Sequence, residues 1–503
     1  MIRQVCLASC FAGLSAIAAS LCPAADWQTA DWHVVPSSSD ALQRAAPIRN
    51  LVATANGTLL GTRTTGSTVQ LLSSSNNGID WDYATDIVAN PSLQFGDPTL
   101  TVTGNGDILA AYRLLHPTAG WSIRMSRSTD GGQSWNVAGT IHNYTGTAGE
   151  FVGAPHFNTL SDGTLQVYYD SEFAAPGGNQ YIAVKDGVWD DGSSAWSWTN
   201  ERIVNTTAIG GAAVRDGLAT VVNLGPDLDG AGDRLMVVTE AVGTLNGQGY
   251  NLIRAFQVEN GGATQADWDN LLDSRVIYQS PLTDPQGHSY NAYAPYALRV
   301  GDGPVVVAFS TDEVLATENL PADLPSAAPR KRHSEIKFIQ TTDSFESWSA
   351  PTTLWGVDHP EFVGDANSGD IYNYQIGLLE LSSNDLLATL DMFDGKQLVF
   401  RPSLGGNTAD FDESGLVDGA DLLIWQRGVG LTGQTSTTTG DATGEGNVDA
   451  ADLALWQQQY GGTTDPAAAG TSVPEPATAA LALVAVLTLA VVPTRRRSWA
   501  NRP

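Results

Sequence analysis

The sequence predicts a mainly β fold followed by a small α-helical module. Between residues 26 and 402, short apolar runs such as "GTLLGT", "GDILAAYR" and "GPVVVAFS" each begin at a Gly or Asp turn, as strands do. A motif of form S-x-D-x-G-x-x-W recurs in this region, which indicates a repeat architecture. From residue 403 the pattern changes to two acidic loops, each followed by an amphipathic segment. The 503 residues therefore divide into one large domain and accessory segments.

Residues 1–25 are typical of a secretory signal. Arg3 precedes an apolar run over 5–21, and small residues follow it, with cleavage expected after Ala24 or Ala25. All three cysteines lie inside this segment, so the processed protein would contain no disulfide. An exported chain without disulfides needs another stabilising device, and bound metal is one candidate.

The C-terminal segment 464–503 ends in three successive features. "VPEP" at 473–476 precedes an apolar run over 477–492, and three arginines follow at 495–497. The run is short for a stable membrane span of about twenty residues. The order of these features resembles the PEP-CTERM sorting signal, which implies transient membrane anchorage and removal by an exosortase. The expected location is the cell surface or the extracellular space; a plain C-terminal membrane anchor is the alternative.

Charge and missing motifs exclude several classes of function. With 25 Lys and Arg against 54 Asp and Glu, the formal charge is −29, so no basic surface is available for nucleic acid. The chain also has no HExxH, phosphate-loop or Ser-elbow motif, which leaves metalloprotease, nucleotide-binding and esterase functions without support.

The repeated motif is clearest in "STDGGQSW" at 128–135. It recurs as "SSNNGIDW" at 74–81 and, with Phe345 in place of a glycine, as "TTDSFESW" at 341–348. An Asp side chain in such a turn accepts backbone N–H groups, and Gly132 tolerates positive φ. Trp135 then packs beneath the hairpin. The motif predicts a turn clasp and requires no substrate.

These motifs resemble the Asp boxes of the sialidase superfamily, which implies a six-bladed β-propeller over residues 26–402. About 62 residues per blade is a suitable length for four strands and their loops. "FGDPTLTVTGNGDILAAYRLLHP", "GAPHFNTLSDGTLQVYYDSE" and "NAYAPYALRVGDGPVVVAFSTDE" follow one another as in the exo-arabinanase family of glycoside hydrolases. The resemblance covers about residues 45–402. It implies an exo-acting glycoside hydrolase, either exo-arabinanase-like or sialidase-like, acting on polysaccharide or glycoconjugate. The alternative is a non-catalytic surface propeller that binds glycan or protein.

Glycoside hydrolysis needs two carboxyl groups, one protonated and one acting as nucleophile or base. Glu172 and Glu240 both follow an apolar strand, in "VYYDSE" and "LMVVTE", and match the family in context. The family's further glutamate, in a "WEPF"-like stretch, is replaced here by Ala154, so Glu150 is the candidate substitute. Asp97 in "FGDPTL" either faces the mouth of the propeller or caps a turn.

Substrate contacts are expected from cationic and polar side chains near strand ends. Arg49 resembles the first-blade arginine with which sialidases hold a substrate carboxylate, and bidentate guanidinium groups suit that role. The remaining candidates are two more arginines, two histidines that could bond sugar hydroxyls, a tyrosine and an aspartate: Arg113, Arg215, His116, His156, Tyr293 (or Tyr290 as the sialidase-type nucleophile) and Asp312.

Residues 403–463 contain two acidic twelve-residue loops. Positions 1, 3, 5, 7, 9 and 12 of such a loop wrap one Ca²⁺ with oxygen ligands. The Asp at position 12 resembles the dockerin variant of the EF-hand, which implies an α-helical pair and leaves a cohesin partner as a weak expectation beside a calcium-stiffened stalk. The predicted ligands are Asp410, Asp412, Ser414, Leu416 (through its carbonyl), Asp418 and Asp421 in the first loop, and Asp441, Thr443, Glu445, Asn447, Asp449 and Asp452 in the second.

Overall fold

The computed structural model describes residues 31–34 and 49–460 with internal gaps, the longest at 205–213, 317–333, 356–372 and 393–398. The predicted signal and sorting segments lie outside the described residues. Within these, no helix is both long and apolar enough to cross a membrane. The chain forms two compact units, residues 1–407 and 408–503, which divide close to the predicted boundary at 402/403.

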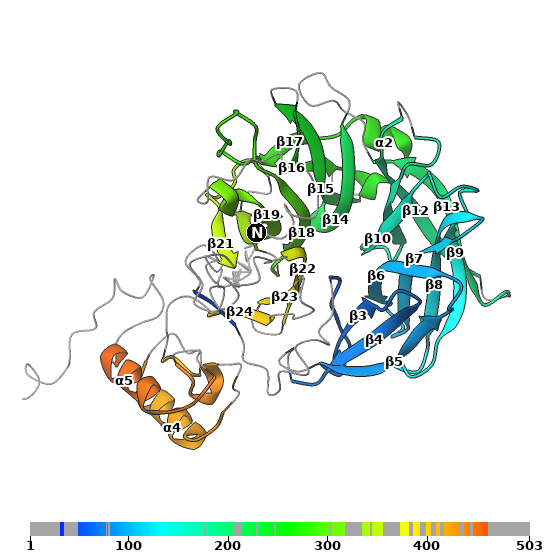
Figure 1. The fold of residues 1–503 in the computed structure, drawn as a ribbon. Helices are drawn as coiled ribbons and strands as arrows, with labels where there is room; N and C mark the ends of the chain where they lie inside the picture. The colour runs from blue at the N-terminus through cyan, green and yellow to red at the C-terminus, as the bar shows by residue number, and fades with distance from the viewer. Residues whose placement is uncertain are drawn as a thin grey trace, which may run out of the picture. The chain divides into compact units, whose positions relative to one another are not determined.

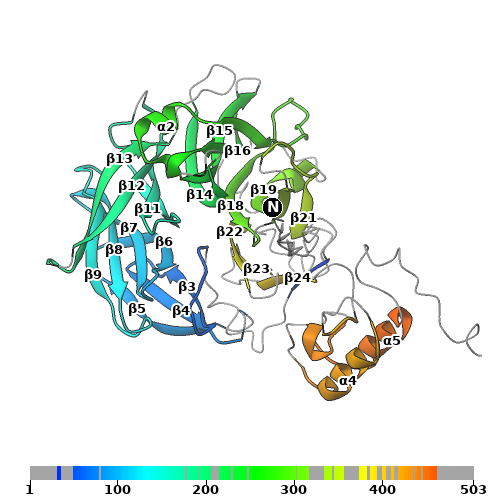
Figure 2. The ribbon, with the colours of Figure 1, turned by 180° about the vertical axis from the view of Figure 1, so that it is seen from behind.

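The first unit is mainly β, as predicted. Its described strands form four four-stranded sheets and one eight-stranded sheet made of two four-stranded halves, so that six antiparallel four-stranded sheets follow one another around a ring when the halves are counted separately (Figures 1 and 2). We number these sheets, the blades, in chain order. The strands of blades 1 to 3 are β2 (Val52–Ala53), β3 (Leu59–Thr64), β4 (Thr68–Ser74) and β5 (Asp82–Ala89); β6 (Gln94–Val102), β7 (Ile108–His116), β8 (Gly120–Ser128) and β9 (Asn136–His142); β10 (Val152–Thr159), β11 (Leu165–Ser171), β12 (Tyr181–Asp190) and β13 (Ala195–Ile203). Those of blades 4 to 6 are β14 (Arg215–Pro226), β15 (Asp233–Leu245), β16 (Gln248–Val258) and β17 (Asp273–Tyr278); β18 (Ala292–Arg299), β19 (Val305–Thr311), β20 (Glu335–Thr341) and β21 (Thr352–Trp355); β22 (Asn373–Glu380), β23 (Leu386–Met392), β24 (Val399–Ser403) and β1 (Asp31–Val34).

Both ends of the propeller chain meet in blade 6. The N-terminal strand β1 pairs with β24, from Asp31 opposite Ser403 to Val34 opposite Phe400, so the first strand completes the last sheet. Blades 2 and 3 are also joined at their outer edges, where Trp196 of β13 pairs with Gly139 of β9. Short helices lie beside the sheets: η2 (Asn260–Gly262), α2 (Gln265–Asp269) and η3 (Glu313–Ala316).

The first strand of blades 2 to 5 contains a β-bulge at the same place. The residue at the bulge has positive φ although it is not glycine: Asp97 (47°), Ala154 (46°), Leu218 (50°) and Ala294 (50°). Proline follows three of these residues, and a bulge tolerates proline because the pairing ladder is already interrupted there. A left-handed conformation costs an L-residue about 1–2 kcal/mol. Each bulge therefore needs support from its neighbours.

The 128–135 motif forms a turn clasp, as predicted, but Ser128 as well as Asp130 accepts its backbone N–H groups. Ser128 Oγ accepts the Gly132 N–H (2.8 Å), whereas Asp130 Oδ1 accepts the Ser134 N–H (2.9 Å) and Trp135 Nε1 donates to the Gly132 carbonyl (3.0 Å). The hydroxyl and N–H of Ser134, and then the hydroxyl of Ser128, donate to Asp130 and lower its pKa to about 2. The carboxylate is thus occupied by the turn.

The motif glycine also brings neighbouring blades together. A Cβ at Gly132 would lie 2.7 Å from Leu71 of blade 1, and one at Gly78 would lie 2.5 Å from Leu387 of blade 6. In the third copy Phe345 (φ 124°) takes the glycine position and packs into the apolar core between blades 4 and 5, with Arg275 of blade 4 over its ring at 4.7 Å. The clasps therefore stabilise the contacts between blades as well as individual hairpins.

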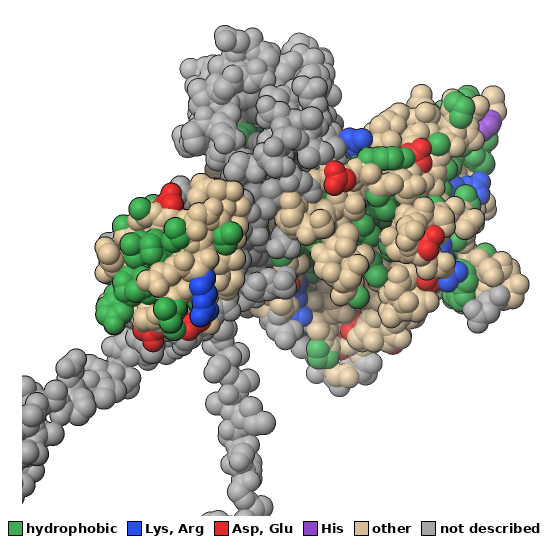
Figure 3. Space-filling model, turned by 90° about the horizontal axis from the view of Figure 1, so that it is seen from below, with side chains coloured by type: hydrophobic (Ala, Val, Ile, Leu, Met, Phe, Trp, Pro, Cys, Tyr) green, Lys and Arg blue, Asp and Glu red, His purple; other side chains and the backbone are tan. Residues whose placement is uncertain are grey.

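The second unit contains two helices in equivalent settings, α4 (Gly419–Gly428) and α5 (Ala450–Gln459), with η5 (Thr437–Thr439) between them. Asp418 and Asp449 are the N-caps, each within a capping box. Figure 3 shows hydrophobic side chains gathered on one face of this unit. Its exposed apolar residues include Leu423, Val429 and Tyr460, each more than half exposed.

Candidate functional site

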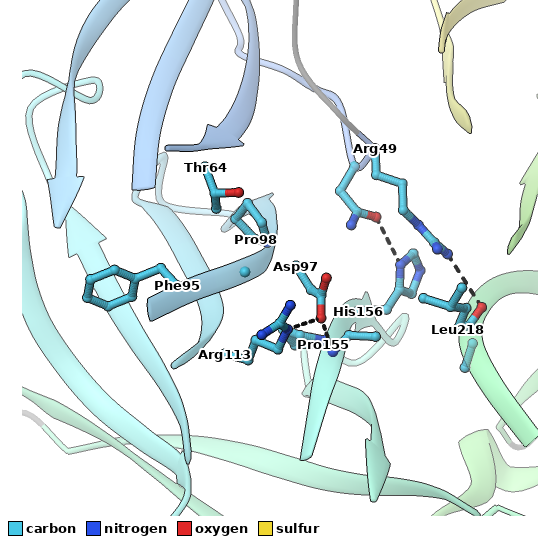
Figure 4. A pocket seen from close by; sticks show the side chains of 13 residues that line it. Arg49, Thr64, Phe95, Asp97, Pro98, Arg113, Pro155, His156 and Leu218 are labelled. Atoms are coloured by element: carbon cyan, nitrogen blue, oxygen red, sulfur yellow. Dashed lines mark hydrogen bonds and ion pairs between the residues drawn. The ribbon is translucent and has the colours of Figure 1, made fainter. Parts of the chain in front are cut away.

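A cavity of about 200 Å³ lies among the first strands of blades 1 to 4 (Figure 4). We call it the mouth pocket. Four of its polar lining residues, Arg49, Asp97, Arg113 and His156, were singled out in the sequence. Its lining includes Arg49, Asn50, Asp97, Arg113, His156 and Leu218.

Asp97 of β6 and Arg113 of β7 face one another from neighbouring strands of blade 2 (Figure 4). Asp97 Oδ2 accepts from Arg113 Nε at 2.5 Å and from the Ala154 N–H of blade 3 at 3.3 Å. The Arg113 guanidinium also lies 5.0 Å from the Trp121 ring and 5.8 Å from the Phe151 ring. Asp97 is therefore an ion-paired carboxylate at the pocket wall, and its partner is held under two aromatic rings.

Arg49 connects blade 1 with two other blades across the centre. Its Nη2 donates to the Pro295 carbonyl (3.1 Å) and, more weakly, to the Leu218 carbonyl (3.4 Å). Burial lowers its pKa, and the acidic groups of Tyr296, Asp170, Asp97 and Glu240 oppose that shift. Among the described residues its buried Nη1 finds no hydrogen-bond partner. Within the described part of the chain, the Nη1 group of Arg49 is thus available to donate to a ligand in the pocket.

His156 lies beside Arg49 and is buried. Its Nδ1 is 3.1 Å from Asn50 Oδ1. Burial, reinforced by the charge of Arg49, lowers the pKa of His156 to about 3. The imidazole is therefore neutral at ordinary pH and can take part only as a neutral hydrogen-bonding group.

Asp170 and Glu240 occupy the same place in blades 3 and 4. Each lies on the second strand of its blade, opposite the glycine that precedes the bulge: Gly153 for Asp170 and Gly217 for Glu240. A Cβ at Gly217 would lie 3.4 Å from both Asp170 Oδ2 and Glu240 Oε1, so these two oxygens are at most about 7 Å apart. The structure thus brings two buried carboxyl groups together beside the mouth pocket, and the sequence prediction included only Glu240.

Each of these carboxylates supports the bulge of the following blade. Asp170 accepts the Leu218 N–H at 3.0 Å (Oδ1) and 3.2 Å (Oδ2), and Glu240 Oε2 accepts the Ala294 N–H at 2.8 Å. The Ala154 N–H bonds to Asp97 in the same way. The donors at the bulges of blades 3, 4 and 5 are therefore all satisfied by acidic side chains of the preceding blade.

The surroundings of Asp170 favour its protonated form. Burial raises the pKa of this carboxyl well above its usual value, and the negative charges of Glu240 and Asp97 raise it further, against the charge of Arg215 and the Leu218 amide. Arg215 is partly exposed, and its Nη1 lies 3.9 Å from Glu240 Oε1. The same arginine thus lies beside Glu240 and opposes the rise in the pKa of Asp170.

Glu172 and Asp312 have a different placement from Glu240. Glu172 Oε2 accepts the Phe151 N–H (3.3 Å), and Asp312 Oδ1 accepts the Asn291 N–H (2.6 Å). Both acids thus cap the residue that precedes the first strand of their own blade. Aligning "LQVYYD" with "LMVVTE" matches Asp170 with Glu240, and this signal in the sequence distinguishes Asp170 from Glu172.

The remaining predicted residues lie away from the two carboxyl groups or are already bonded. His116 ends β7, where its Nδ1 accepts the Ala119 N–H (3.1 Å). Tyr293 is buried among the bulges, and its hydroxyl bonds to Ser334. Glu150 lies half-buried in the loop before β10.

In the second unit, the described part of the first loop gathers three predicted calcium ligands. Carboxylate oxygens of Asp410, Asp412 and Asp421 all lie within 4.8 Å of one another. Asp421 is fully buried and accepts the N–H groups of Phe411 (2.6 Å) and Asp418 (2.7 Å), which fixes the loop around it. An all-oxygen set of this kind suits Ca²⁺.

The second loop repeats part of this arrangement. Asp441 Oδ2 accepts the Gly446 N–H (2.8 Å), and Asp452 Oδ2 accepts the Asp449 N–H (2.7 Å). Asn447 is exposed and pairs with Thr432 in an isolated bridge. Four predicted ligands, Ser414, Leu416, Thr443 and Glu445, lie outside the described residues.

Comparison with known proteins gives only distant similarity. No family model and no curated protein matches the chain. Among solved structures, a mutant α-L-arabinofuranosidase from Fusarium graminearum bound to an iminosugar inhibitor and the Penicillium chrysogenum α-L-arabinanase bound to arabinobiose each share 14% identity (TM-score 0.47, 74% of this chain, 96% of that chain). A Hadza microbial sialidase shares 15% identity (TM-score 0.44, 74% of this chain, 68% of that chain). At this similarity, function has to be inferred from the residues at the mouth pocket.

Proposed function

We propose that the protein is a glycoside hydrolase whose catalytic carboxyl groups are Asp170 and Glu240. The observation that carries this proposal is that both side chains approach Gly217, which places their oxygens within about 7 Å of each other, while burial and neighbouring charges raise the pKa of Asp170 and Arg215 lies beside Glu240. Hydrolysis of a glycoside requires one carboxylic acid and one carboxylate on the two sides of the scissile bond. This pair therefore replaces the Glu172 and Glu240 pair expected from the sequence.

In the proposed reaction, Asp170 gives its proton to the glycosidic oxygen as the bond to the anomeric carbon breaks. The Glu240 carboxylate, beside Arg215, attacks the anomeric carbon or takes the proton of the water that does so. Asp97 adds negative charge near the positive charge that develops on the sugar ring. The mouth pocket lies beside this pair, and its lining includes Asp97 but neither Asp170 nor Glu240. It is smaller than the roughly 300–1,000 Å³ of sites for drug-sized ligands, which favours a single terminal sugar and exo action.

The test is a hydrolysis screen with aryl α-L-arabinofuranosides, arabino-oligosaccharides and aryl sialosides. Glu240→Gln and Asp170→Asn should each lower kcat by a factor of about 10²–10⁴, the usual range for loss of a proton-transfer group. Glu172→Gln is the matched control, because this acid caps a strand of the same blade and should leave turnover unchanged. Equal losses in the control, or full activity in Glu240→Gln, would refute the assignment.

A sialidase-type activity is the second candidate, and one observation favours it. The unpaired Nη1 of Arg49 at the pocket offers a buried positive donor that a substrate carboxylate could accept. Release of sialic acid that is abolished by Arg49→Met would support this candidate. Binding of arabino-oligosaccharides or sialosides by wild-type protein with no hydrolysis of either would instead support the non-catalytic glycan-binding alternative.

For the second unit we propose binding of Ca²⁺ in both acidic loops, supported by the convergence of Asp410, Asp412 and Asp421. Export through the N-terminal segment and sorting through the C-terminal one complete the proposal, with an exosortase as processing partner. Calorimetric titration of the full chain with Ca²⁺ checks the first part: about two ions should bind, and Asp421→Asn together with Asp452→Asn should abolish binding.

A further inference from the structure

A buried glutamine links the two sides of the candidate catalytic pair. Gln180 directly precedes β12 and is 3% exposed. Its Oε1 accepts from Arg215 Nη2 at 2.6 Å, while its Nε2 donates to Asp170 Oδ2 at 3.2 Å and to the Asp216 carbonyl at 2.7 Å. A guanidinium only donates and a carbonyl only accepts, so the orientation of this amide is fixed. Its N–H group must therefore point at Asp170.

Gly217 provides the room for this contact. Its φ is not in the left-handed region, so its backbone conformation does not require glycine. A Cβ at this position would nevertheless lie 2.9 Å from Gln180 Nε2 and 3.4 Å from the oxygens of Asp170 and Glu240. Because Gly217 has no side chain, the Gln180 amide and both carboxyl groups can all lie close to its Cα.

We propose that Gln180 is a positioning residue that orients Asp170 for proton donation and limits how strongly it holds its proton. The inference rests on the proposed function, because it assigns Asp170 the role of acid. Several charged groups act on Asp170: Glu240 from β15 and Asp97 from β6 disfavour its ionised form, and Arg215 and the buried Arg49 favour it. Gln180 connects Arg215 with Asp170, because its amide accepts from the Arg215 cation and donates to the Asp170 oxygen, and so helps the cation to stabilise ionised Asp170.

The variant Gln180→Met removes the donor while keeping the side-chain length. Because this donor stabilises the ionised carboxylate, losing it should raise the pKa of Asp170 by about one to two units. Activity requires protonated Asp170 and is lost as pH rises through this pKa. The alkaline limb of the kcat/KM profile should therefore move to higher pH by about one to two units, while kcat at the optimum falls because Asp170 is less well oriented.

A second measurement does not depend on activity. An acid whose pKa is raised by folding destabilises the protein increasingly as pH rises from its unfolded to its folded pKa. The difference in melting temperature between wild type and Asp170→Asn, followed from pH 4 upward, should therefore level off at the pKa of Asp170. The same comparison in the Gln180→Met background should level off at higher pH. If wild type hydrolyses no glycoside, this measurement still tests the contact.

The matched control is Gln166→Met, which changes another buried glutamine of blade 3, one that donates to the Gly261 carbonyl (2.8 Å) at the far end of β11. It should lower the melting temperature without moving either titration. If Gln180→Met does not fold, the partly exposed Arg215→Met should move both titrations upward in its place. Unchanged titrations in a folded Gln180→Met variant, or equal shifts in the control, would overturn the proposal.

Discussion

Gly132→Ala should destabilise the propeller, because the added methyl group would collide with the neighbouring blade. Gly132 has φ of 93°, and a left-handed conformation costs an L-residue about 1–2 kcal/mol. The new methyl group would also lie 2.7 Å from Leu71 of blade 1, and overpacking of this kind costs about 1–3 kcal/mol. The expected loss in the free energy of unfolding is thus about 2–5 kcal/mol.

Gly131→Ala isolates the conformational part of this loss. Gly131 has φ of 74°, but a Cβ there would have no atom within 4 Å. It should therefore cost only about 1–2 kcal/mol. Urea denaturation of both variants gives the difference, which reports the contact between blades. Equal losses would refute the claim that the motif glycine permits a close approach of two blades.

A double-mutant cycle sharpens the test. Leu71→Ala in wild type creates a cavity and should cost about 2–5 kcal/mol. In the Gly132→Ala background the same change should cost less, because the new methyl group occupies part of the vacated space. Additive losses would place the effect of Gly132→Ala elsewhere.

Four further predictions concern the carboxylates and the metal. Glu240→Ala should lose about 1–3 kcal/mol of stability by leaving the buried Ala294 N–H unpaired, whereas Glu240→Gln keeps an acceptor and should melt close to wild type. Asp130 has a pKa lowered to about 2, so its contribution to stability is complete above its unfolded pKa of about 4; the melting-temperature difference between wild type and Asp130→Asn should shrink as pH falls from 4 to 2. Arg254→Met should cost about 3–5 kcal/mol in urea denaturation, since it strands the buried Asp216 carboxylate that Arg254 Nε meets at 2.7 Å. Chelation with EGTA should lower the melting temperature of the second unit and leave that of the propeller unchanged.

The sequence predicted the sheet content and the clasps well because both depend on local patterns. Short apolar runs between Gly and Asp turns define strands, and the 128–135 motif contains all the groups of its turn. Closure of the ring by β1 and β24 was not predictable in this way, since it pairs residues 31–34 with residues almost at the other end of the propeller. The packing of Phe345 between two blades could not be predicted either, because it depends on contacts with residues distant in the sequence.

The proposed pair shares Glu240 with the pair expected from the sequence, and there is a definite physical reason why Asp170 was not predicted. Asp170 and Glu172 lie two residues apart in "YYDSE", so both project from the same side of an extended chain. Only strand register separates them: Asp170 pairs with Gly153 next to the bulge, whereas Glu172 lies past the end of β11. Register depends on the partner strand and on the bulge, and neither is visible in a single apolar run.

The bulges explain why acidic side chains gather at the centre of this propeller. At the bulges of blades 3 to 5 a backbone N–H bonds to a side chain, and a buried donor without a partner costs about 1–3 kcal/mol. Asp97, Asp170 and Glu240 each satisfy such a donor in the next blade, so the fold itself requires buried acceptors there. Burial and the negative charges of Glu240 and Asp97 raise the pKa of Asp170, which is the acid in the proposed reaction. The same contacts that stabilise the ring thus produce the pairing of acid and carboxylate on which the proposed chemistry depends.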